Sequence, residues 1–219
     1  MRIEGMVFDM DGTLLDTERQ YIEGYVELAK EWGLELPKEL PYECMGLPRE
    51  KVRQKYAECY GDDFEFDKFK SEMMERLHKL WERDGIPVKP GVPELLDYCS
   101  ERKIPCAVAT STSRESAVPM LKKAGLLEYF ASIVCGDEIK NGKPNPDIFL
   151  EGARRIGVPP EKCGGAEDSR SGICAVHRAG MTAFFMVDML EPDKEIENTA
   201  DYICSDMFKV IDIIEGLNS

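Results

Sequence analysis

Residues 6–18 read M-V-F-D-M-D-G-T-L-L-D-T-E, and the rest of the chain can be arranged around this stretch. An apolar run, residues 6–8, leads to two aspartates one residue apart, Asp9 and Asp11, before a glycine and a threonine turn the chain. Two carboxylates at so short a spacing repel each other unless a cation or a proton holds them. The pair therefore indicates a bound metal ion, or a nucleophile beside an acid/base group. A strand that ends in a solvated Asp-Gly turn would have the same short sequence.

Composition and charge exclude several classes of partner. The 219 residues suffice for one large domain or for one domain with a smaller one inserted. Apolar residues make up 43% and charged residues 32%, which is typical of a soluble globular protein. A net charge of −14 repels nucleic acid and anionic membrane surfaces, so we expect neither as a partner. Without a leader sequence or a long apolar run, we expect a cytoplasmic protein, and we expect a monomer.

The eight cysteines are scattered along the chain without C-x-x-C spacing. Several lie inside apolar runs, as Cys106 and Cys135 do. We therefore predict buried, reduced thiols and not disulfides. The two histidines, His78 and His177, are far apart and lack the spacing of zinc ligands, so we expect no zinc site.

The segment after the first predicted strand, residues 3–9, has a helical pattern throughout. Apolar residues recur there at intervals of three and four. The predicted helices span residues 17–32, 49–60 and 66–84, and the prolines between the first two are Pro37, Pro41 and Pro48. Because no convincing strand occurs, we predict a helical domain at residues 17–88, inserted into a domain of residues 1–16 and 89–219.

Short apolar runs alternate with helical patterns from Pro90 onward. The predicted strands are residues 105–110, 132–135, 163–167, 182–187 and 202–204. The predicted helices are residues 92–102, 115–124, 147–156, 171–179 and 207–217. This alternation implies a parallel sheet with both faces covered. We therefore predict an α/β fold, a doubly wound, Rossmann-like parallel sheet with an inserted helical domain.

Polar residues cluster at the ends of three predicted strands and in one loop before a predicted helix, at the edge of the sheet where ligands bind in such folds. They are Asp9, Asp11 and Thr13; Thr110 and Ser111; Lys143 in N-G-K-P-N-P-D; and Glu167 and Asp168 in G-G-A-E-D-S. A nucleophile, hydroxyl donors, a cation and further carboxylates suit a phosphoryl group. Mg²⁺ fits this set best, because it binds through a few carboxylates and substrate oxygens. Considered alone, Lys143 could equally be a solvated lysine in a loop. Glu167 and Asp168 could equally cap the start of the next helix.

The order of these motifs resembles the haloacid dehalogenase superfamily. D-M-D-G-T, T-S, K-P-N-P-D-I-F and E-D-S follow one another as in the branch that contains beta-phosphoglucomutase and small-molecule phosphatases. The resemblance covers nearly the whole chain. The helical insertion after the first motif is similar to the alpha-helical cap domain of that branch.

The resemblance implies a role for each reacting group. Asp9 would attack phosphorus and form an aspartyl-phosphate. Asp11 would protonate the leaving oxygen and then activate the incoming water or hydroxyl. Thr110 would hold the phosphate, and Lys143 would balance the charge of Asp9 and of the phosphoryl oxygens.

The resemblance also implies a metal site and substrate contacts. The implied ligands of Mg²⁺ are the Asp9 carboxylate, the Asp11 carbonyl and Asp168, with Glu167 nearby directly or through water. The candidate substrate-binding residues are Thr13, Ser111 and Arg49. Arg49, in G-L-P-R-E, occupies a place that resembles the phosphate-contacting arginine of beta-phosphoglucomutase. A surface arginine at a helix start would have the same sequence.

Two departures from the family pattern bear on function. Tyr21 stands where beta-phosphoglucomutases have a histidine, and L-L-D-T-E is typical of phosphatases in the branch. We therefore expect a phosphatase for a small phosphorylated metabolite, with a sugar phosphate as the expected class and a sugar phosphomutase as the alternative. A non-catalytic metabolite-binding protein is a third hypothesis, which the complete set of acids disfavours. Gly164 and Gly165, inside a predicted strand, indicate close packing or local flexibility.

Overall fold

The computed structural model describes residues 2–44, 47 and 49–219, so Pro48 and its predicted break lie outside the described residues. The chain divides into two compact units. The first contains Met1–Asp16 and Pro87–Ser219, and the second contains Thr17–Ile86. Among the described residues, no helix combines the length and the apolar character needed to cross a membrane.

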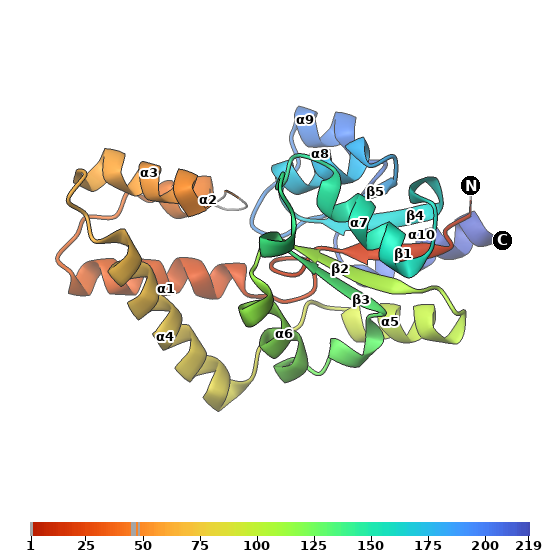
Figure 1. Cartoon of the computed structure of the whole chain (residues 1–219), viewed down its shortest axis with the longest axis horizontal. Helices are drawn as coiled ribbons and strands as arrows, with labels where there is room; N and C mark the ends of the chain where they lie inside the picture. The colour runs from red at the N-terminus through yellow and green to blue at the C-terminus, as the bar shows by residue number, and fades with distance from the viewer. Residues whose placement is uncertain (1, 45–46, 48) are drawn as a thin grey trace. The chain divides into compact units, whose positions relative to one another are not determined.

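A six-stranded sheet forms the centre of the first unit (Figure 1). Its strands are β1 (Gly5–Phe8), β2 (Cys106–Thr110), β3 (Ser132–Cys135), β4 (Cys163–Glu167), β5 (Thr182–Met186) and β6 (Tyr202–Cys204). They lie in the order β3-β2-β1-β4-β5-β6, and every neighbouring pair is parallel. The predicted α/β fold with a doubly wound parallel sheet is confirmed, because this order reverses beside β1.

Helices cover both faces of the sheet. In the first unit they are α5 (Val92–Glu101), α6 (Arg114–Lys123), α7 (Asp147–Ile156), α8 (Arg170–Arg178), α9 (Lys194–Thr199) and α10 (Met207–Asn218). Short 3₁₀ turns span Leu127–Tyr129, Gly136–Glu138 and Pro160–Lys162. The sequence pattern did not predict α9, which is too short to show a helical period. β1 begins at Gly5, two residues later than predicted.

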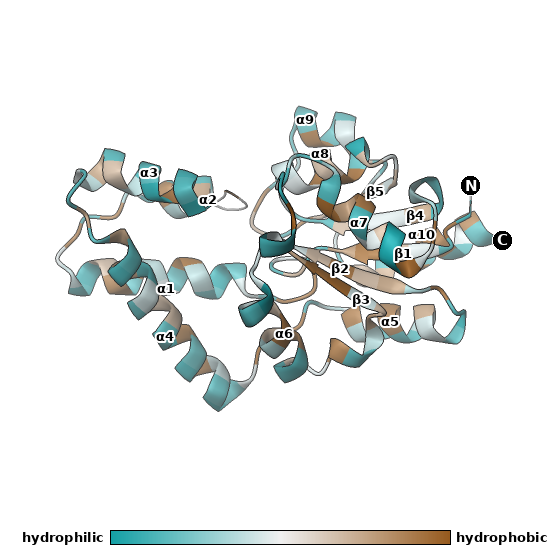
Figure 2. Ribbon diagram, in the orientation of Figure 1, coloured by the Kyte–Doolittle hydropathy of each residue, from teal (hydrophilic) through white to brown (hydrophobic). Residues whose placement is uncertain are grey.

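The strands at the centre of the sheet are mostly apolar because both of their faces are buried. Val7 packs in a cluster with Ile148 and Phe149 of α7 and Val176 of α8. Met6 and Phe8, which alternate with Val7, are also fully buried, so the opposite face of β1 is covered as well. Figure 1 places α5 on the side of the sheet opposite α7, and Figure 2 shows β2 and β3 coloured mainly as hydrophobic. Two-sided burial thus explains the near-continuous apolar runs.

The two glycines of β4 have a packing reason. A Cβ atom on Gly164 would lie 2.6 Å from Met6 Sδ and 2.8 Å from Phe184 Cε2. On Gly165 it would lie 2.5 Å from Val176 Cγ1, on the opposite face of the strand. Of the two readings that the sequence left open, close packing accounts for both glycines. β4 can therefore lie tightly between its covering layers just before Glu167 and Asp168.

Substituting Gly165 is expected to destabilise the first unit. Gly165→Ala should lower the free energy of unfolding by about 1–3 kcal/mol, because the stiff Val176 side chain must move. The matched control is Gly216→Ala in α10, where an added Cβ meets nothing within 4 Å. It should raise the free energy of unfolding by about 0.4–1 kcal/mol. Urea denaturation measures both, and an unchanged Gly165→Ala protein would contradict the packing argument.

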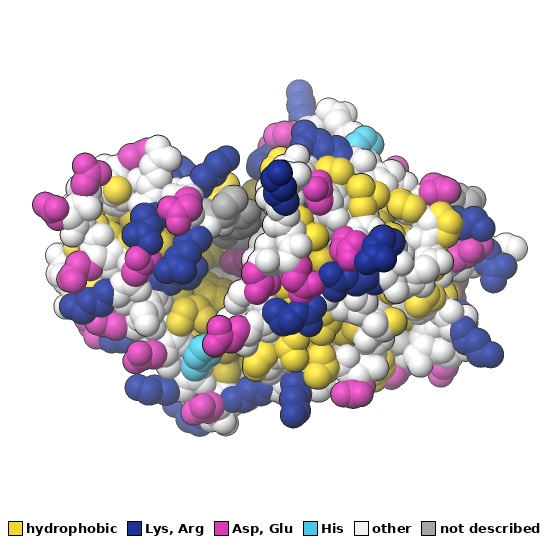
Figure 3. Space-filling model, viewed as in Figure 1, with side chains coloured by type: hydrophobic (Ala, Val, Ile, Leu, Met, Phe, Trp, Pro, Cys, Tyr) yellow, Lys and Arg dark blue, Asp and Glu magenta, His cyan; other side chains and the backbone are white. Residues whose placement is uncertain are grey.

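Arg155 connects α7 with β3 and with the 3₁₀ turn that follows it. The Arg155 guanidinium donates to Glu138 at 2.7 Å, to Glu151 at 2.7 Å and to the Ile133 carbonyl at 3.0 Å. Hydrogen bonds from Arg154 and Arg155 lower the pKa of Glu151 to about 2. On the face seen in Figure 3, basic and acidic side chains are likewise interspersed. Such mixing lets opposite charges pair locally despite the net charge of −14.

The second unit is entirely helical in its described residues. Its helices are α1 (Glu18–Glu31), α2 (Leu40–Cys44), α3 (Arg49–Tyr60) and α4 (Phe66–Asp84). The sequence did not predict α2, which contains Pro41 in its first turn, where proline is tolerated. Phe69 and Trp81 of α4 are buried, and the Tyr21 ring of α1 meets Trp81 edge-on at 6.0 Å. Tyr21 therefore contributes to the packing of α1 against α4.

Two chain segments of the first unit join it to the second, and they pair with each other. The backbone N–H of Asp16 donates to the Pro87 carbonyl at 2.9 Å, and that of Lys89 donates to the Leu14 carbonyl at 3.0 Å. The Lys89 ammonium also lies 2.6 Å from the carboxylate of Asp188, after β5. The end of the loop that follows β1 is thus tied to the rest of the sheet.

All eight cysteines are free, which confirms the prediction of reduced thiols. Five of them are buried: Cys99, Cys106, Cys135, Cys163 and Cys204. The prediction of burial is wrong for Cys59, which is exposed, and only partly right for Cys44 and Cys174. Cys44 ends α2 and Cys59 lies in α3, a helix whose buried residue is Tyr56.

Candidate active site

Three strand ends meet at one edge of the sheet. Asp9 follows β1 directly, Thr110 ends β2 and Glu167 ends β4. Because β1 lies between β2 and β4 and all three are parallel, these residues converge at the carboxyl edge. The Asp9 N–H donates to the Ala166 carbonyl at 3.0 Å, so the backbone of Asp9 is still held by β4.

Lys143 lies between two buried carboxylates at this edge. Its ammonium donates to Glu167 Oε1 at 2.8 Å and forms an ion pair with Asp9. At most 10% of any of these three side chains is exposed. The ammonium also lies 5.2 Å from the centre of the Phe149 ring. The structure therefore shows a buried cation in place of the solvated loop lysine that the sequence alone allowed.

Burial and charge set the protonation of this group. Burial raises the pKa of Asp9 to about 7, and the neighbouring Lys143 ammonium opposes that shift. Burial alone would lower the pKa of Lys143, but the carboxylates of Asp9 and Glu167 outweigh it and raise the pKa. Lys143 therefore stays charged at neutral pH, while the Asp9 carboxyl titrates near neutrality in the metal-free protein.

The loop after β1 brings Asp168 against its backbone. Gly12 has a φ of +78°, in the left-handed region that glycine tolerates. A Cβ atom on Gly12 would lie 2.2 Å from Asp168 Oδ2, so any other residue would displace that carboxylate. The Thr13 hydroxyl donates to Asp168 Oδ1 at 2.8 Å. This contact fixes the Asp168 carboxylate beside the loop that carries Asp11.

Glu167 is held just as closely by the start of α8. Its Oε2 accepts the Ser169 N–H at 2.6 Å, and a Cβ atom on Gly172 would lie 1.7 Å from its Oε1. The N-cap of α8 is Ser169, whose hydroxyl accepts the Gly172 N–H at 3.0 Å. The side-chain cap of α8 is thus Ser169, directly after the two acids that one interpretation of the sequence placed at the helix start.

The loop after β2 adds hydroxyl groups. Thr110 Oγ1 accepts the backbone N–H of Thr112 at 3.0 Å, and Thr112 Oγ1 donates to Asp11 Oδ2 at 2.9 Å. Ser111 between them is exposed. Sequence reasoning missed Thr112, although it is the third residue of the T-S-T-S-R cluster. The sequence did contain an indication of its role, because the cluster has further hydroxyl side chains after Thr110 and Ser111.

The described carboxylates suit a hard divalent cation. Asp9, Glu167 and Asp168 lie on adjacent strand ends with little solvent exposure, and oxygen ligands of this kind are those that Mg²⁺ prefers. The missing side chain of Gly12 is what lets Asp168 approach the loop of Asp11. The donor chemistry of these residues thus fits the Mg²⁺ that the sequence predicted, and its coordination stays a prediction.

The family model for haloacid dehalogenase-like hydrolases matches residues 6–186, most of the chain. The chain belongs to this family. The matched span begins with β1 and ends with β5, so it includes every strand end at which the hydrolase gathers its acidic residues.

Relatives of the hydrolase include named phosphatases. It is 35% identical over 185 residues to the Phosphorylated carbohydrates phosphatase of Thermotoga maritima, covering 84% of this chain and 85% of that protein. It is 33% identical over 182 residues to the Fructose-1-phosphate phosphatase YqaB of Escherichia coli, covering 83% and 95%. A solved Thermotoga maritima structure, provisionally assigned as a beta-phosphoglucomutase, superposes with a TM-score of 0.80 at 31% identity, covering 98% and 100%. The family resemblance predicted from the motifs is confirmed.

Most of the predicted site residues of the hydrolase lie together. Hydrogen bonds and ion pairs connect them in three groups: Asp9 with Lys143 and Glu167, Thr13 with Asp168, and Asp11 with Thr112 and Thr110. Ser111 lies in the same loop as Thr110 but is exposed. Arg49 is in the second unit, where it donates to Asp67 at 2.8 Å. Gly46 and Pro48 of its motif lie outside the described residues.

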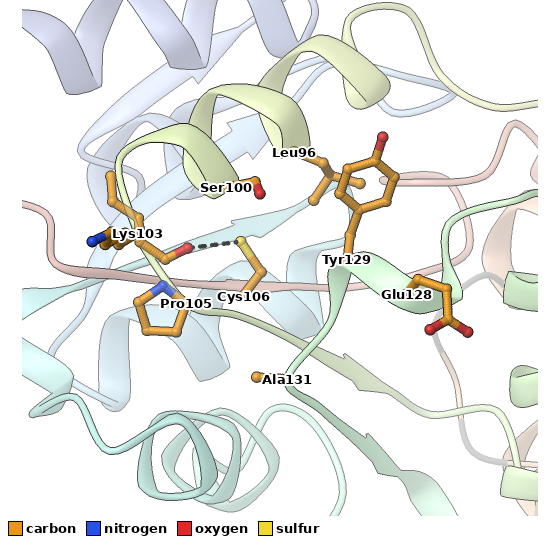
Figure 4. A pocket seen from close by; sticks show the side chains of 9 residues that line it. Leu96, Ser100, Lys103, Pro105, Cys106, Glu128, Tyr129 and Ala131 are labelled. Carbon is orange, nitrogen blue, oxygen red and sulfur yellow. Dashed lines mark hydrogen bonds between the residues drawn. The ribbon is translucent and has the colours of Figure 1, made fainter.

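A hollow of about 450 Å³ in the first unit lies far from this chemistry (Figure 4). Pro105 and Cys106, at the beginning of β2, line it together with Leu96 and Ser100 of α5 and Tyr129. The acidic residues of the hydrolase are at the other end of the strands. This hollow is therefore separate from the candidate active site.

Proposed function

We propose that this chain is a Mg²⁺-dependent phosphatase that hydrolyses a small phosphorylated sugar through an aspartyl-phosphate. The observation that carries the proposal is the buried Lys143 ammonium between Asp9 and Glu167 at the carboxyl edge of the sheet. A buried cation at a carboxylate nucleophile suits a reaction that brings in a dianionic phosphoryl group. The names of the similar phosphatases support the sugar phosphate class.

Asp9 is the proposed nucleophile in the first step. One of its carboxylate oxygens attacks phosphorus, and the bond between phosphorus and the sugar oxygen breaks. Lys143 holds the Asp9 carboxylate in place and balances the added negative charge. Because Thr110 Oγ1 already accepts the Thr112 N–H, its own proton can be donated to a phosphoryl oxygen.

Asp11 is the proposed acid and then the proposed base. It gives a proton to the leaving sugar oxygen as the first bond breaks. In the second step it takes a proton from the water that attacks the aspartyl-phosphate. Inorganic phosphate leaves, and Asp9 returns to a free carboxylate. Both steps balance without any further reactant.

A Mg²⁺ ion would be held by the Asp9 and Asp168 carboxylates and the Asp11 carbonyl, with Glu167 nearby. When bound, it supplies positive charge to the phosphoryl oxygens. The role of the second unit, with Arg49, as a cap that contacts the substrate also belongs to this proposal. Thr13 and Ser111 are the remaining proposed substrate-binding residues of the first unit.

The test is phosphate release from a panel of sugar phosphates, with and without Mg²⁺. We expect turnover of at least one sugar phosphate that depends on the metal. Absence of turnover on the whole panel, in a protein that binds Mg²⁺, would instead support a non-catalytic binding protein. A panel that includes hexose 1-phosphates, hexose 6-phosphates and pentose phosphates covers the sugar phosphate class.

The solved structure provisionally assigned as a beta-phosphoglucomutase favours one alternative, a sugar phosphomutase. In that reaction a sugar hydroxyl replaces water as the acceptor of the phosphoryl group. Tyr21 weighs against it, because it stands where the mutases have a histidine and its ring packs on Trp81. Conversion of beta-glucose 1-phosphate to glucose 6-phosphate, requiring a bisphosphate primer and releasing little phosphate, would decide for the mutase.

Mg²⁺ binding is expected to depend on pH. Because burial raises the pKa of Asp9 to about 7, the metal competes with a proton at low pH. One such proton makes the affinity at pH 8 about tenfold higher than at pH 6. Calorimetric titration in two buffers of different protonation enthalpy measures the affinity and the proton released. The Asp168→Asn variant should bind Mg²⁺ more weakly at both pH 6 and pH 8, and its affinity should depend on pH as in the wild type. A pH-independent affinity without proton release would contradict Asp9 as a ligand.

A further inference from the structure

Thr112 is fixed at three points in the loop after β2. Its N–H donates to Thr110 Oγ1 at 3.0 Å, and its carbonyl accepts the N–H of Gly136 at 3.2 Å. Its hydroxyl donates to Asp11 Oδ2 at 2.9 Å. These contacts join the loops that follow β1, β2 and β3. The Thr112 hydroxyl is therefore presented to Asp11 from a backbone that is held on both sides.

Gly136 supports this loop from behind. A Cβ atom at Gly136 would lie 2.3 Å from the Ser111 carbonyl oxygen and 2.9 Å from its carbon. Only glycine permits so close an approach of the two backbones. The branched side chain of Thr112 has few χ1 rotamers, which further restricts where its hydroxyl can lie. The end of β3 thus sets the position of a hydroxyl that contacts the end of β1.

The contact draws the Asp11 carboxyl toward the end of β2. Thr110, the proposed phosphate-holding residue, ends that strand. A threonine hydroxyl donates to a carboxylate and accepts from a protonated carboxyl group. The same partner can therefore hold Asp11 before and after it gives up its proton. This suits a group that acts first as an acid and then as a base.

We propose that Thr112 is a positioning residue, which holds Asp11 in the orientation from which it protonates the leaving oxygen. This inference rests on the proposed phosphatase function. It assigns to Thr112 a contact with Asp11 and not with the substrate. Loss of the hydroxyl should then impair proton donation, while the attack of Asp9 on phosphorus continues.

The dependence of rate on the leaving group separates these effects. The ratio kcat/KM reports steps up to formation of the aspartyl-phosphate. An alkyl phosphate needs a proton on its leaving oxygen, phenyl phosphate needs it less, and 4-nitrophenyl phosphate needs it least. For Thr112→Val we expect kcat/KM to fall by about 10- to 100-fold on an alkyl sugar phosphate. On 4-nitrophenyl phosphate the fall should stay below about threefold, with phenyl phosphate between them.

Three further variants complete the experiment. Thr112→Ser retains the hydroxyl without the branch and should restore most of the loss. Asp11→Asn/Thr112→Val should be no slower than Asp11→Asn alone, because the hydroxyl acts through Asp11. Thr199→Val, which removes a hydroxyl bonded to the Glu195 carbonyl in α9, is the control for an unrelated threonine and should leave kcat/KM unchanged. Urea denaturation checks that each variant is folded.

The outcomes distinguish failure of the positioning role of Thr112 from failure of the proposed phosphatase function. An equal loss on phenyl and 4-nitrophenyl phosphate would mean that Thr112 contacts the substrate or the phosphoryl group, and would overturn the positioning role. An additive loss in the double variant, or no loss in Thr112→Val, would overturn it too. If the wild type hydrolyses none of these esters with Mg²⁺ present, the proposed function fails, and the positioning role with it.

Discussion

Asp9→Asn is expected to lower the Mg²⁺-dependent phosphatase activity by at least about 10³-fold, because an amide oxygen is a poor nucleophile toward phosphorus. The variant should fold, since Glu167 remains as a partner for the buried ammonium at 2.8 Å. Asp97→Asn is the matched control, because Asp97 is an exposed residue of α5 that accepts a bond from Tyr129 at 2.8 Å. Its activity should equal that of the wild type.

A second measurement identifies the nucleophile directly. Acid quenching during turnover should trap a phosphoryl group on the peptide that contains Asp9, which mass spectrometry detects. The trapped peptide should be missing from the Asp9→Asn protein. Full metal-dependent activity of Asp9→Asn would show that the nucleophile assignment is wrong. Activity loss with phosphorylation of a different residue would contradict it equally.

Lys143→Met is expected to abolish most activity and also to destabilise the first unit. Removing the ammonium leaves Asp9 and Glu167 buried without the cation that lies between them. Breaking a buried ion pair from one side costs about 3–5 kcal/mol. Lys140→Met is the control, because Lys140 is exposed in the same loop. Its free energy of unfolding should stay within about 0.5 kcal/mol of the wild type.

The destabilisation should depend on pH in a defined direction. Without the Lys143 ammonium, which opposes the shift, burial and the Glu167 carboxylate raise the folded-state pKa of Asp9 further above its unfolded value. A raised pKa means that stability is greatest at low pH and is lost as pH rises through the folded-state pKa. The deficit of Lys143→Met relative to wild type should thus be smaller at pH 5 than at pH 8. Denaturation at both values tests this, and a deficit that shrinks as pH rises would contradict it.

Local patterns predicted most of the fold because each element carries its own periodicity. The residues of α3, α4, α7, β3 and β4 match their predicted bounds. The short helices α2 and α9 escaped prediction, since five or six residues hold too little of a helical period. The role of Gly164 and Gly165 could not be predicted from local sequence. Their close packing depends on Val176, Met6 and Phe184, which belong to other elements.

Candidate site residues could be predicted where they belong to a short sequence motif. Asp9, Asp11, Glu167 and Asp168 follow strands, and their spacing marks them. Thr112 was missed because its partner, Asp11, is 101 positions away in the chain. Arg49 was predicted by analogy, and in the structure it donates to Asp67 within its own unit. Its role as a substrate contact stays a prediction.

The α/β class, the family and the acids at the strand ends follow from the amino-acid sequence alone. Periodicity and motif order are properties of neighbouring residues, and the chain displays them before it folds. The burial of Lys143 between Asp9 and Glu167 does not follow from the sequence, because Asp9 is 134 positions away in the chain. That contact depends on which strands pair, in what order and in what register. The distance between two side chains across a sheet depends on how all the strands and their covering helices pack together.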